Sequence, residues 1–401
     1  MEKALDGIKV LDFSHLLQGP FATQLLGDLG ADIIKIERAG KGDMFRGMTF
    51  FNAWVGGTES PCFLAWNRNK RSIALNLKSP RVHEILMDMA KTADVVVQNF
   101  RPGVLEKLGY GYEDFKAVNP RIIYCSGSGY GESGPYVSRP GQDMLLQGLT
   151  GVASATGQAS SPPHPLGAGL PDQLGAMNMV YAILAALLWR EKTGKGQRIE
   201  VSLLHSLMAH LSQEYFSVLN LGRDFERPDS GIGHPGAEAP FGIYATRDGR
   251  HVSIAMSPFR HVMETIGADH LLHYDTPDQL FAKRDEIWRE VDAVTRTFDC
   301  DTLLKRLLDA DVWTAEVKDF RRAAEDPQVV HCGIIQSYRH PIAGEVQAVA
   351  PAVKLSETPA SIDRPAPMIG EHGREILAEH GIDAAEIAAL EEAGDLTVQT
   401  A

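Results

Sequence analysis

Asp172 is the residue whose position points most directly to covalent chemistry. It follows the segment 169–171 (GLP) and precedes a long apolar pattern, so we predict that it caps the N-terminus of a helix. A carboxylate in that place is held ionised, and an ionised carboxylate shielded from water is a competent nucleophile toward an acyl carbon. Gln142, Asp143 and the glycine-rich segment 126–134 are expected to line the same cavity. A purely structural cap fits Asp172 as well, and the two roles are compatible.

The loop 14–20 (SHLLQGP) is a candidate phosphate site. A helix is predicted to begin in it, and the first turn of a helix offers unpaired N–H groups and a partial positive charge. The dinucleotide fingerprint G-x-G-x-x-G is absent from this loop, so a nicotinamide-dependent function loses its main support. The alternative interpretation is that Gly19 and Pro20 simply start a helix, and that His15 is a loop histidine whose hydrogen bonds are satisfied.

Cationic side chains at three further places suit an anionic ligand. Arg38 follows the second predicted strand, the segment 67–71 is NRNKR, and the segment 99–103 is NFRPG, in which Phe100 stands between an amide and a cation. Arginines at the carboxyl ends of strands in an open sheet bind anions, and a flat aromatic ring beside them suits a purine. A solvated charged face explains the same residues without any ligand.

Alternating strands and helices must position these residues. Residues 8–14 and 32–37 are predicted to be parallel strands joined by a helix over 21–29. Further strands are expected at 71–75, 94–98 and 121–126, and further helices at 80–91 and 102–108. This repeated alternation is typical of an α/β fold with a doubly wound, Rossmann-like sheet.

The second half of the chain is predicted to contain a smaller domain. Apolar residues at steps of three and four predict a helix over 172–192 that is buried almost all round, and a second long helix follows from 201 toward 221. Beyond them, strands at 241–246 and 251–256 flank Asp248-Gly249, a pair that favours a type I′ hairpin turn. The predicted organisation is a large domain over 1–221, a Gly- and Pro-rich linker over 222–240, a small α+β domain over 241–330, and a C-terminal segment over 331–401.

Composition bounds the class of protein. The chain has 401 residues with 44% apolar and 23% charged content, as globular proteins do, and its net charge of -13 argues against nucleic-acid binding. The longest apolar stretch, 176–189, is shorter than the roughly 20 residues that a membrane span needs. The four cysteines show no metal-binding spacing. These features predict a cytoplasmic protein with no nucleic-acid, membrane or metal partner.

In their shared order and spacing, these segments resemble the class III CoA-transferases. That family includes the formyl-CoA:oxalate and crotonobetainyl-CoA:carnitine CoA-transferases, with the α-methylacyl-CoA racemases as relatives. The resemblance extends over essentially the whole chain. It rests on the segments 5–20, 29–42, 69–77, 94–103, 126–135, 193–201 and 370–381.

The resemblance implies a CoA-transferase whose large Rossmann-like domain is interrupted by an inserted small domain, so that 331–401 would be a linker and a C-terminal return to the large domain. It also implies that two ring-shaped subunits interlock as a homodimer. The carboxylate matching Asp172 attacks an acyl-CoA to form a mixed anhydride, CoA returns to give an aspartyl thioester, and a small carboxylic acid accepts the CoA. Acyl-CoA is then a substrate, and no tightly bound cofactor or metal is expected. The CoA-binding residues that the resemblance implies are His15, Leu17, Gln18, Arg38, Leu75, Asn99, Phe100 and Lys107, with Gln142 and Asp143 in the substrate pocket.

Some positions depart from the family pattern. A glutamine is common where Leu17 stands, with Gln18 beside it here, and an arginine often stands where Lys107 does. The glycine run that forms an active-site lid in the oxalate enzymes is absent from 231–240, so an oxalate specificity is not implied. Two alternatives stay open. One is a racemase-like isomerase, in which a histidine would stand in place of Gln142 as a second base, and the other is a non-catalytic CoA-binding or unrelated Rossmann protein.

Overall fold

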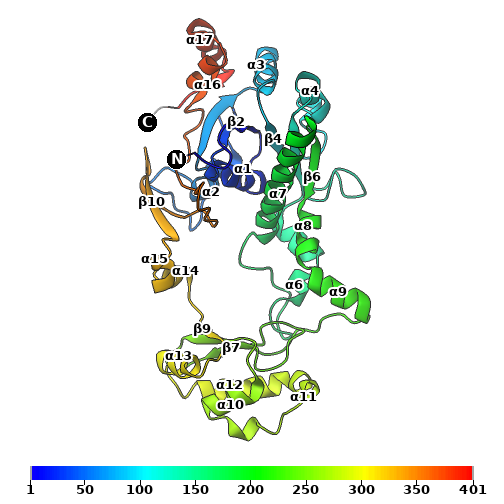
Figure 1. Cartoon of the computed structure of the whole chain (residues 1–401), viewed down its shortest axis with the longest axis vertical. Coiled ribbons are helices and arrows are strands. Elements are labelled where there is room, and N and C mark those ends of the chain that lie inside the picture. The colour runs from blue at the N-terminus through cyan, green and yellow to red at the C-terminus, as the bar shows by residue number, and fades with distance from the viewer. Residues whose placement is uncertain (1, 400–401) are drawn as a thin grey trace. The chain divides into compact units, whose positions relative to one another are not determined.

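The computed structural model describes residues 2–399 and divides into two compact units (Figure 1). Unit 1 comprises the residues up to 146, residues 168–211 and those from 327 onward, whereas unit 2 comprises residues 147–167 and 212–326. Residues 1, 400 and 401, at the ends of the first and last predicted segments, lie outside the described part. Each unit has a hydrophobic core of its own.

Unit 1 is built on a seven-stranded sheet in the order β12-β3-β2-β1-β4-β5-β6. Its neighbouring strands are parallel except for β12 and β3. The order reverses between β1 and β4, so the sheet is doubly wound as predicted, and the loops after these two strands leave the same edge. The strands are β1 (Lys9–Asp12), β2 (Asp32–Arg38), β3 (Lys70–Leu75), β4 (Val95–Gln98), β5 (Ile123–Ser128), β6 (Arg198–Ser202) and β12 (Leu396–Thr397).

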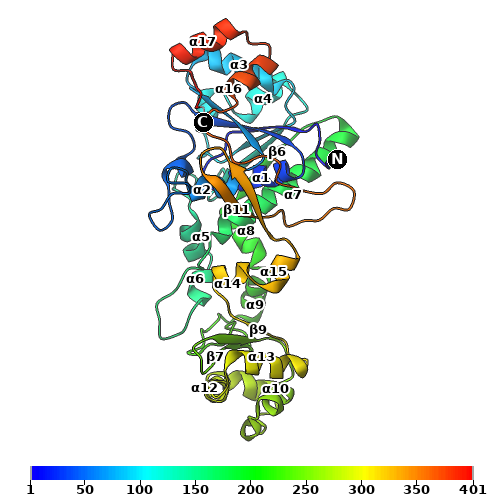
Figure 2. The ribbon, with the colours of Figure 1, turned by 90° about the vertical axis from the view of Figure 1, so that its left-hand side faces the viewer.

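Helices cover both faces of this sheet. On one face, α1 (Gln18–Asp28) and α7 (Leu170–Thr193) share a core with β1, β4 and β5. On the other face lie α3 (Pro80–Ala90), α4 (Tyr112–Val118), α16 (Gly373–Glu379) and α17 (Ala384–Glu392), which Figure 2 shows grouped together. The remaining elements of this part are η1 (Met44–Gly47), α2 (Pro61–Trp66), η2 (Glu106–Leu108), α5 (Asp143–Leu149), α8 (Leu203–His210), α15 (Pro327–His331), β10 (Ile335–His340) and β11 (Gly344–Val349).

The long helix α7 is not buried all round, contrary to the prediction. Its apolar residues Met177, Tyr181 and Leu188 are 49%, 64% and 67% exposed. Apolar residues therefore stand on both sides of the helix, and only one side faces the core of unit 1. By length and composition α7 is also apolar enough to cross a membrane, a criterion that core helices of soluble proteins meet as well.

Two other predicted helices differ from the structure. Residues 102–108 contain only the 3-10 turn η2, because Gly109 follows at a φ of +80° and ends it. The helix expected from 201 toward 221 is divided into α8 and α9 (Ser212–Leu221), with Leu211 outside helical geometry. The other strands and helices predicted for the first half lie within a few residues of their ranges, whereas α2, α4, α5, α6 (Val152–Ala155) and β6 were not predicted.

Unit 2 packs helices against the antiparallel sheet β7-β8-β9. The hairpin turn is not the predicted type I′ turn, because Gly249 has a positive φ but Asp248 does not. Gly249 N donates to Thr246 O, and Asp248 accepts from Thr246 Oγ1, as in a type I turn closed by a left-handed glycine. The elements are α6 (Val152–Ala155), α9, β7 (Gly242–Ala245), β8 (His251–Ile254), α10 (Phe259–Ile266), η3 (Asp269–Leu271), α11 (Pro277–Ala282), α12 (Arg284–Thr295), α13 (Cys300–Asp309), β9 (Thr314–Glu316) and α14 (Phe320–Ala324).

The compact units and the predicted domain boundaries differ at two places. Residues 147–167 and α9 belong to unit 2 rather than to the large domain. The segment 222–240 is also more than a linker, because its Ile232 and Ala239 are 7% and 1% exposed and enter the core of unit 2. The chain returns to unit 1 at residue 327, and β12 then adds to the edge of the large sheet.

Candidate active site

A cavity of about 320 Å³ opens in unit 1 beside the carboxyl ends of β1, β4 and β5. This is the edge at which a doubly wound sheet binds its ligands. The loops after these strands and the first turns of α1 and α7 form its walls. The lining residues are His15, Leu16, Leu17, Gln18, Met44, Asn99, Phe100, Arg101, Pro102, Ser128, Gly129, Tyr130, Gly131, Val137, Arg139, Pro140, Gly141, Gln142, Asp172 and Leu203.

Beneath the loop after β1 lies a network of buried charges. Asp12 contacts Lys70 at 3.1 Å and Lys35 contacts Asp43 at 2.8 Å, and all four side chains are at most 1% exposed. Burial opposes the charged forms, yet the two lysines lower the pKa of Asp12 to about 2, and burial lowers the pKa of Lys70 to about 8. Lys35 Nζ also donates to Ser14 O at 2.9 Å, which ties the network to the loop.

The same network holds Leu16 in a conformation that leucine rarely adopts. Leu16 has a φ of +65°, and its N–H donates to Asp43 Oδ1 at 3.1 Å. A positive φ on a residue with a branched side chain persists only where its surroundings enforce it. Asp43 therefore fixes the direction in which the chain enters α1.

His15 is bound to the loop after β4 through its main chain. His15 N donates to Asn99 Oδ1 at 2.9 Å, and Asn99 Nδ2 donates back to His15 O at 2.8 Å. The imidazole meets the ring of Phe100 edge-on, with centroids 4.7 Å apart. Burial lowers the pKa of His15, so its ring is neutral at physiological pH. Three residues predicted from two distant segments are thus brought together at one wall of the cavity.

Asp172 also lines this cavity, and its carboxyl group has a strongly shifted pKa. It is the third residue of α7, and its N–H donates to Asp143 Oδ2 at 3.3 Å. Burial, together with the nearby negative charge of Asp143, raises the pKa of Asp172 to about 7. At neutral pH this carboxyl group is therefore about half ionised.

The predicted capping role of Asp172 is wrong. The helix begins two residues earlier, because Pro171 suits the first turn, and Gly169 occupies the cap position without a side-chain hydrogen bond. Asp143, from the start of α5, accepts from the first turn instead. The expectation that the helix end holds Asp172 ionised is wrong as well, since loss of water outweighs the helix dipole there.

Three residues assigned to CoA by resemblance do not line this cavity. Arg38 and Leu75 are paired at the ends of β2 and β3, where Arg38 is exposed and Leu75 is 0% exposed. The Leu75 carbonyl accepts from Ala39 N, and the Leu75 side chain belongs to the hydrophobic core. Lys107 lies exposed in η2. Arg38 and Lys107 are accessible to a ligand only outside the cavity.

The cavity also contains residues that the sequence did not single out. Gln142 and part of the 126–134 segment line it as expected, but so do Met44 and Arg139. Asp143, which was expected there too, does not line it, since its buried carboxylate accepts from the first turn of α7. The guanidinium of Arg139 lies 3.7 Å from the ring centroid of Tyr136. The sequence could have pointed to Arg139, because it lies only three residues before Gln142, in the segment 138–143 (SRPGQD). Within residues 2–399 no group of three His, Cys, Asp or Glu side chains is suited to hold a metal ion.

The cations of the basic segment 67–71 are buried and paired with carboxylates of unit 1, so they do not form a solvated face. Arg68 contacts Asp28 at 2.7 Å, Lys70 contacts Asp12, and Arg71 contacts Asp32 at 2.7 Å. Arg68 and Arg71 lie near the start of β3, at the edge opposite the cavity, whereas Lys70 Nζ extends to Asp12 at the end of β1. Their partners lie far away in the sequence, which is why the segment alone suggested a free positive charge.

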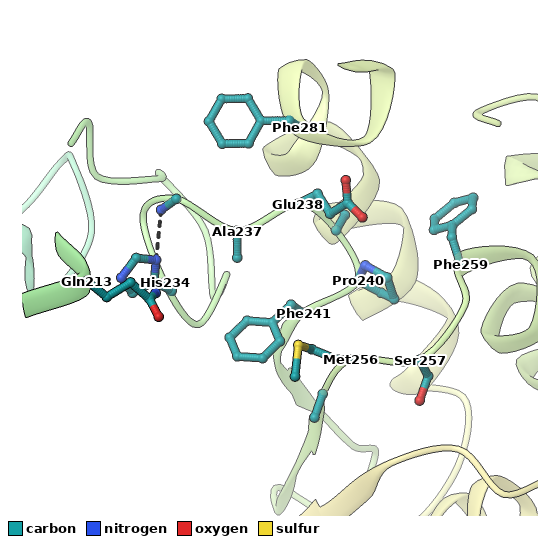
Figure 3. A pocket seen from close by; sticks show the side chains of 13 residues that line it. Gln213, His234, Ala237, Glu238, Pro240, Phe241, Met256, Ser257, Phe259 and Phe281 are labelled. Atoms are coloured by element: carbon teal, nitrogen blue, oxygen red, sulfur yellow. Dashed lines mark hydrogen bonds between the residues drawn. The ribbon is translucent and has the colours of Figure 1, made fainter. Parts of the chain in front are cut away.

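Unit 2 contains a different kind of cavity, of about 550 Å³ (Figure 3). Figure 3 shows the rings of Phe241, Phe259 and Phe281 around the segment 237–240, with His234 at one side. His234 Nδ1 accepts from Gly236 N at 3.0 Å. Glu238 is the one carboxylate among its lining residues, and it is exposed.

The sequence profile of CoA-transferase family III matches residues 5–373. The chain belongs to this family. Membership indicates CoA-transferase activity on CoA thioesters and carboxylates.

Named relatives of this family III protein cover nearly all of it. The human succinyl-CoA:glutarate CoA-transferase is 35% identical over 94% of the chain and 86% of its own length. A formyl-CoA:oxalate CoA-transferase of Streptomyces coelicolor is 32% identical over 98% of the chain and 99% of its own length. A crystal structure of a CAIB/BAIF family protein from Brucella suis is 31% identical, covers 95% of the chain and all of the other protein, and superposes with a TM-score of 0.85.

Proposed function

We propose that this protein transfers CoA from an acyl-CoA donor to a small carboxylic acid, with Asp172 as the nucleophile. The observation that carries the proposal is that the Asp172 carboxyl group lines the unit 1 cavity with a pKa raised to about 7. A carboxylate of that basicity is a stronger nucleophile than an ordinary aspartate, and enough of it is ionised at neutral pH to react. The relatives named as CoA-transferases support the same reaction.

The reaction proceeds by a series of balanced acyl exchanges. An oxygen of Asp172 attacks the thioester carbon of the donor, a C–O bond forms, the C–S bond breaks, and CoA leaves as thiolate. The thiolate then attacks the Asp172 carbonyl of the mixed anhydride, which releases the donor acid and leaves CoA on Asp172 as a thioester. The acceptor carboxylate attacks that thioester, and the thiolate finally takes the acceptor acyl group from the second anhydride and frees Asp172.

We propose that CoA binds along one wall of the unit 1 cavity and at the rim of that cavity. His15, Leu17, Asn99 and Phe100 offer an aromatic and polar wall, and the exposed cations Arg38 and Lys107 are available to phosphate oxygens outside it. CoA acts as a substrate in this scheme, without a tightly bound cofactor.

The acceptor is proposed to be a dicarboxylic acid. Glutarate and oxalate, which appear in the names of the relatives, both carry two carboxylates. Arg101 and Arg139 line the cavity, and an arginine pairs bidentately with a carboxylate that does not react. Succinyl-CoA as donor with a series of dicarboxylic acids of increasing length is therefore the first set of substrates to measure.

A racemase-like reaction is the second candidate, and Gln142 argues against it. Racemisation next to a thioester needs a proton-transfer group on each face of the carbon, and an amide at position 142 cannot take up and return a proton near neutral pH. We expect no α-deuterium uptake by a 2-methylacyl-CoA incubated with the enzyme in deuterated water. Deuteration as fast as CoA exchange would favour the racemase.

The protein is also proposed to be a cytoplasmic homodimer of interlocked rings. Support comes from the exposed apolar side chains on α7 and α8, which a partner subunit would cover: Met177, Tyr181, Leu188, Trp189 and Met208. Threaded subunits cannot separate while folded. Dissociation and unfolding should therefore coincide in urea, and a folded monomer at low concentration would contradict interlocking.

The covalent intermediate provides the direct test of the proposed function. The full-length enzyme is mixed with succinyl-CoA, quenched in acid and digested, and the peptides are analysed by mass spectrometry. We expect CoA attached to the peptide that contains Asp172, and no adduct in Asp172→Asn protein that binds CoA normally. A wild-type enzyme that exchanges CoA without an adduct on Asp172 contradicts the mechanism.

A further inference from the structure

Gln18 is the first residue of α1, and its side chain is enclosed in unit 1. The residue is 3% exposed, and its Nε2 atom has no hydrogen-bond partner among the residues that the structure describes. An amide N–H removed from water without an acceptor costs free energy, and native proteins keep few such groups. Gln18 also lines the cavity that contains Asp172. A molecule that enters this cavity is therefore expected to supply the acceptor.

Two glycines leave the space that this amide occupies. A Cβ atom on Gly127, in β5, would stand 2.6 Å from Gln18 Oε1, and a Cβ atom on Gly175, in α7, would stand 2.6 Å from Gln18 Nε2. A larger residue at either position would displace the amide. Gly175 is three residues after Asp172, and residues three apart share one face of a helix. The Nε2 end of Gln18 thus meets the face of α7 that carries Asp172.

We propose that Gln18 Nε2 donates a hydrogen bond to the carbonyl oxygen of the acyl group that reacts at Asp172. This inference rests on the proposed transfer reaction, and it makes Gln18 a catalytic residue instead of the CoA contact that the family resemblance suggested. When Asp172 attacks a thioester, the C=O electron pair moves onto the oxygen, and it returns as the C–S bond breaks. The amide stabilises the negative charge in between and keeps its own protons.

The first turn of α7 does not provide this donor at Asp172. Asp172 N already donates to Asp143 Oδ2 at 3.3 Å, and Pro171 before it has no N–H. Leu17, which lies beside Gln18 at the same wall, has an apolar side chain. The Gln18 amide therefore supplies a hydrogen bond that neither Leu17 nor these two positions of α7 can make.

The test separates loss of rate from loss of binding. Gln18→Met keeps the length of the side chain and removes the donor, so we expect kcat for CoA transfer to fall by about 10²- to 10³-fold. The Kd for free CoA, measured by calorimetry, should stay within about threefold of the wild-type value, because free CoA has no acyl oxygen. An unchanged kcat, or a rise in Kd that accounts for the whole loss, overturns the proposal.

A matched control and a spectroscopic measurement exclude a merely structural effect. Gln173→Met alters an amide next to Asp172 whose side chain lines a separate cavity with Phe21 and Trp66, and it should retain wild-type kcat. In Asp172→Asn protein, which binds without reacting, the infrared carbonyl band of thioester-¹³C-labelled succinyl-CoA should move to higher frequency when Gln18→Met is added. A band that stays in place contradicts the hydrogen bond even if Gln18→Met lowers the yield of folded protein.

Failure of this proposal is distinguishable from failure of the proposed function. If wild-type enzyme forms no CoA adduct on Asp172, the transfer mechanism fails without reference to any Gln18 variant. If the adduct forms at the wild-type rate in Gln18→Met protein, only the role of Gln18 is rejected.

Discussion

The two units of this protein differ in how far they bury their ion pairs. In unit 1, the pairs Asp12–Lys70 and Lys35–Asp43 are removed from water beneath the loop that lines the candidate active site. In unit 2, pairs such as Lys305–Asp309 lie on the surface, with both side chains more than 60% exposed. A buried pair fixes the backbone around it because breaking it leaves an uncompensated charge, whereas an exposed pair contributes little.

The two cavities also differ in how far water reaches their carboxyl groups. The cavity of unit 1 holds Asp172, whose pKa burial raises to about 7, and its walls are fixed by hydrogen bonds between loops. The cavity of unit 2 is walled by aromatic rings around 237–240, and its one carboxylate, Glu238, is exposed. A carboxylate deprived of water is more basic and a stronger nucleophile, so the first cavity is suited to covalent chemistry, whereas the second offers mainly apolar surface.

The largest expected effect compares the carboxyl groups of the two cavities. Asp172→Asn should reduce CoA transfer on the order of 10³-fold or more, since the amide keeps the shape and loses the nucleophile. Glu238→Gln, the matched change in unit 2, should leave kcat within about threefold of wild type. Initial rates with succinyl-CoA and an acceptor acid measure both. Comparable losses of CoA-transfer activity in the two variants would show that the two cavities do not differ in this way.

The second effect compares the two kinds of ion pair. Lys70→Met leaves Asp12 buried without its partner and should lower the free energy of unfolding by about 3–5 kcal/mol. Lys305→Met removes half of an exposed pair and should change it by no more than about 0.5 kcal/mol. Urea unfolding followed by circular dichroism gives both values. Equal destabilisation would show that burial does not set the difference.

A third comparison concerns exposed arginines. Arg38→Ala should raise the KM for acyl-CoA by about 10- to 100-fold and leave the KM for the acceptor nearly unchanged, because a lost charged hydrogen bond to phosphate weakens CoA alone. Arg247→Ala, which removes an exposed pair with Asp299 in unit 2, should change neither constant. Steady-state kinetics with each substrate varied in turn decide this. A rise in both KM values for Arg38→Ala contradicts a specific CoA contact.

Asp172 is expected to weaken the fold that contains it. Its pKa is raised in the folded state, so the folded protein binds the proton more tightly than the unfolded chain, and stability falls as pH rises from about 4 through 7. At pH 8 the Asp172→Asn protein should therefore be more stable than wild type, by about 1–2 kcal/mol after allowance for partial access of water. At pH 4 the difference should vanish. Thermal unfolding at the two pH values tests the sign.

The smallest effect is a shift in the pH profile. Because the ionised form of Asp172 reacts, kcat should increase with pH through an apparent pKa near 7. Asp143→Asn removes the nearby negative charge, so that apparent pKa should fall by up to about one unit while burial keeps it above that of an ordinary aspartate. Glu238→Gln should not move the profile. A shift to higher pH in Asp143→Asn protein would contradict the assigned charge effect.

The sequence predicted five of the seven strands of the unit 1 sheet, because they are apolar runs such as VVV at 95–97 separated by helical patterns. It did not predict β6 or β12. It also located Asp172, since the Gly-Leu-Pro start and the apolar run after it are local signals. It misplaced the helix start by two residues, because Pro171 is equally good in the first turn. The exposed side of α7 could not be predicted, because periodicity shows which residues are apolar but not how many neighbours cover them.

The parts of the site that escaped prediction depend on contacts between distant segments. Lys70 appeared as a free cation because its partner, Asp12, is 58 positions away. Asp43 enforces the positive φ of Leu16, and the leucine residue itself gives no reason to expect that conformation. The slot for Gln18 is made by Gly127 and Gly175, from two other elements. Such features are set by tertiary packing and have no signal in local composition.

The place of β12 has a consequence for how the protein is made. This last strand covers the edge of β3, and Asn76 Nδ2 bonds to Asp395 Oδ1 across 319 positions of sequence. At about 5–20 residues per second, a ribosome delivers the covering strand roughly 15–65 s after β3. During that time β3 presents an open edge, the kind of surface that recruits other nascent chains. Shortening the C-terminus by about ten residues should therefore reduce the soluble yield even though every residue of the candidate active site is still present.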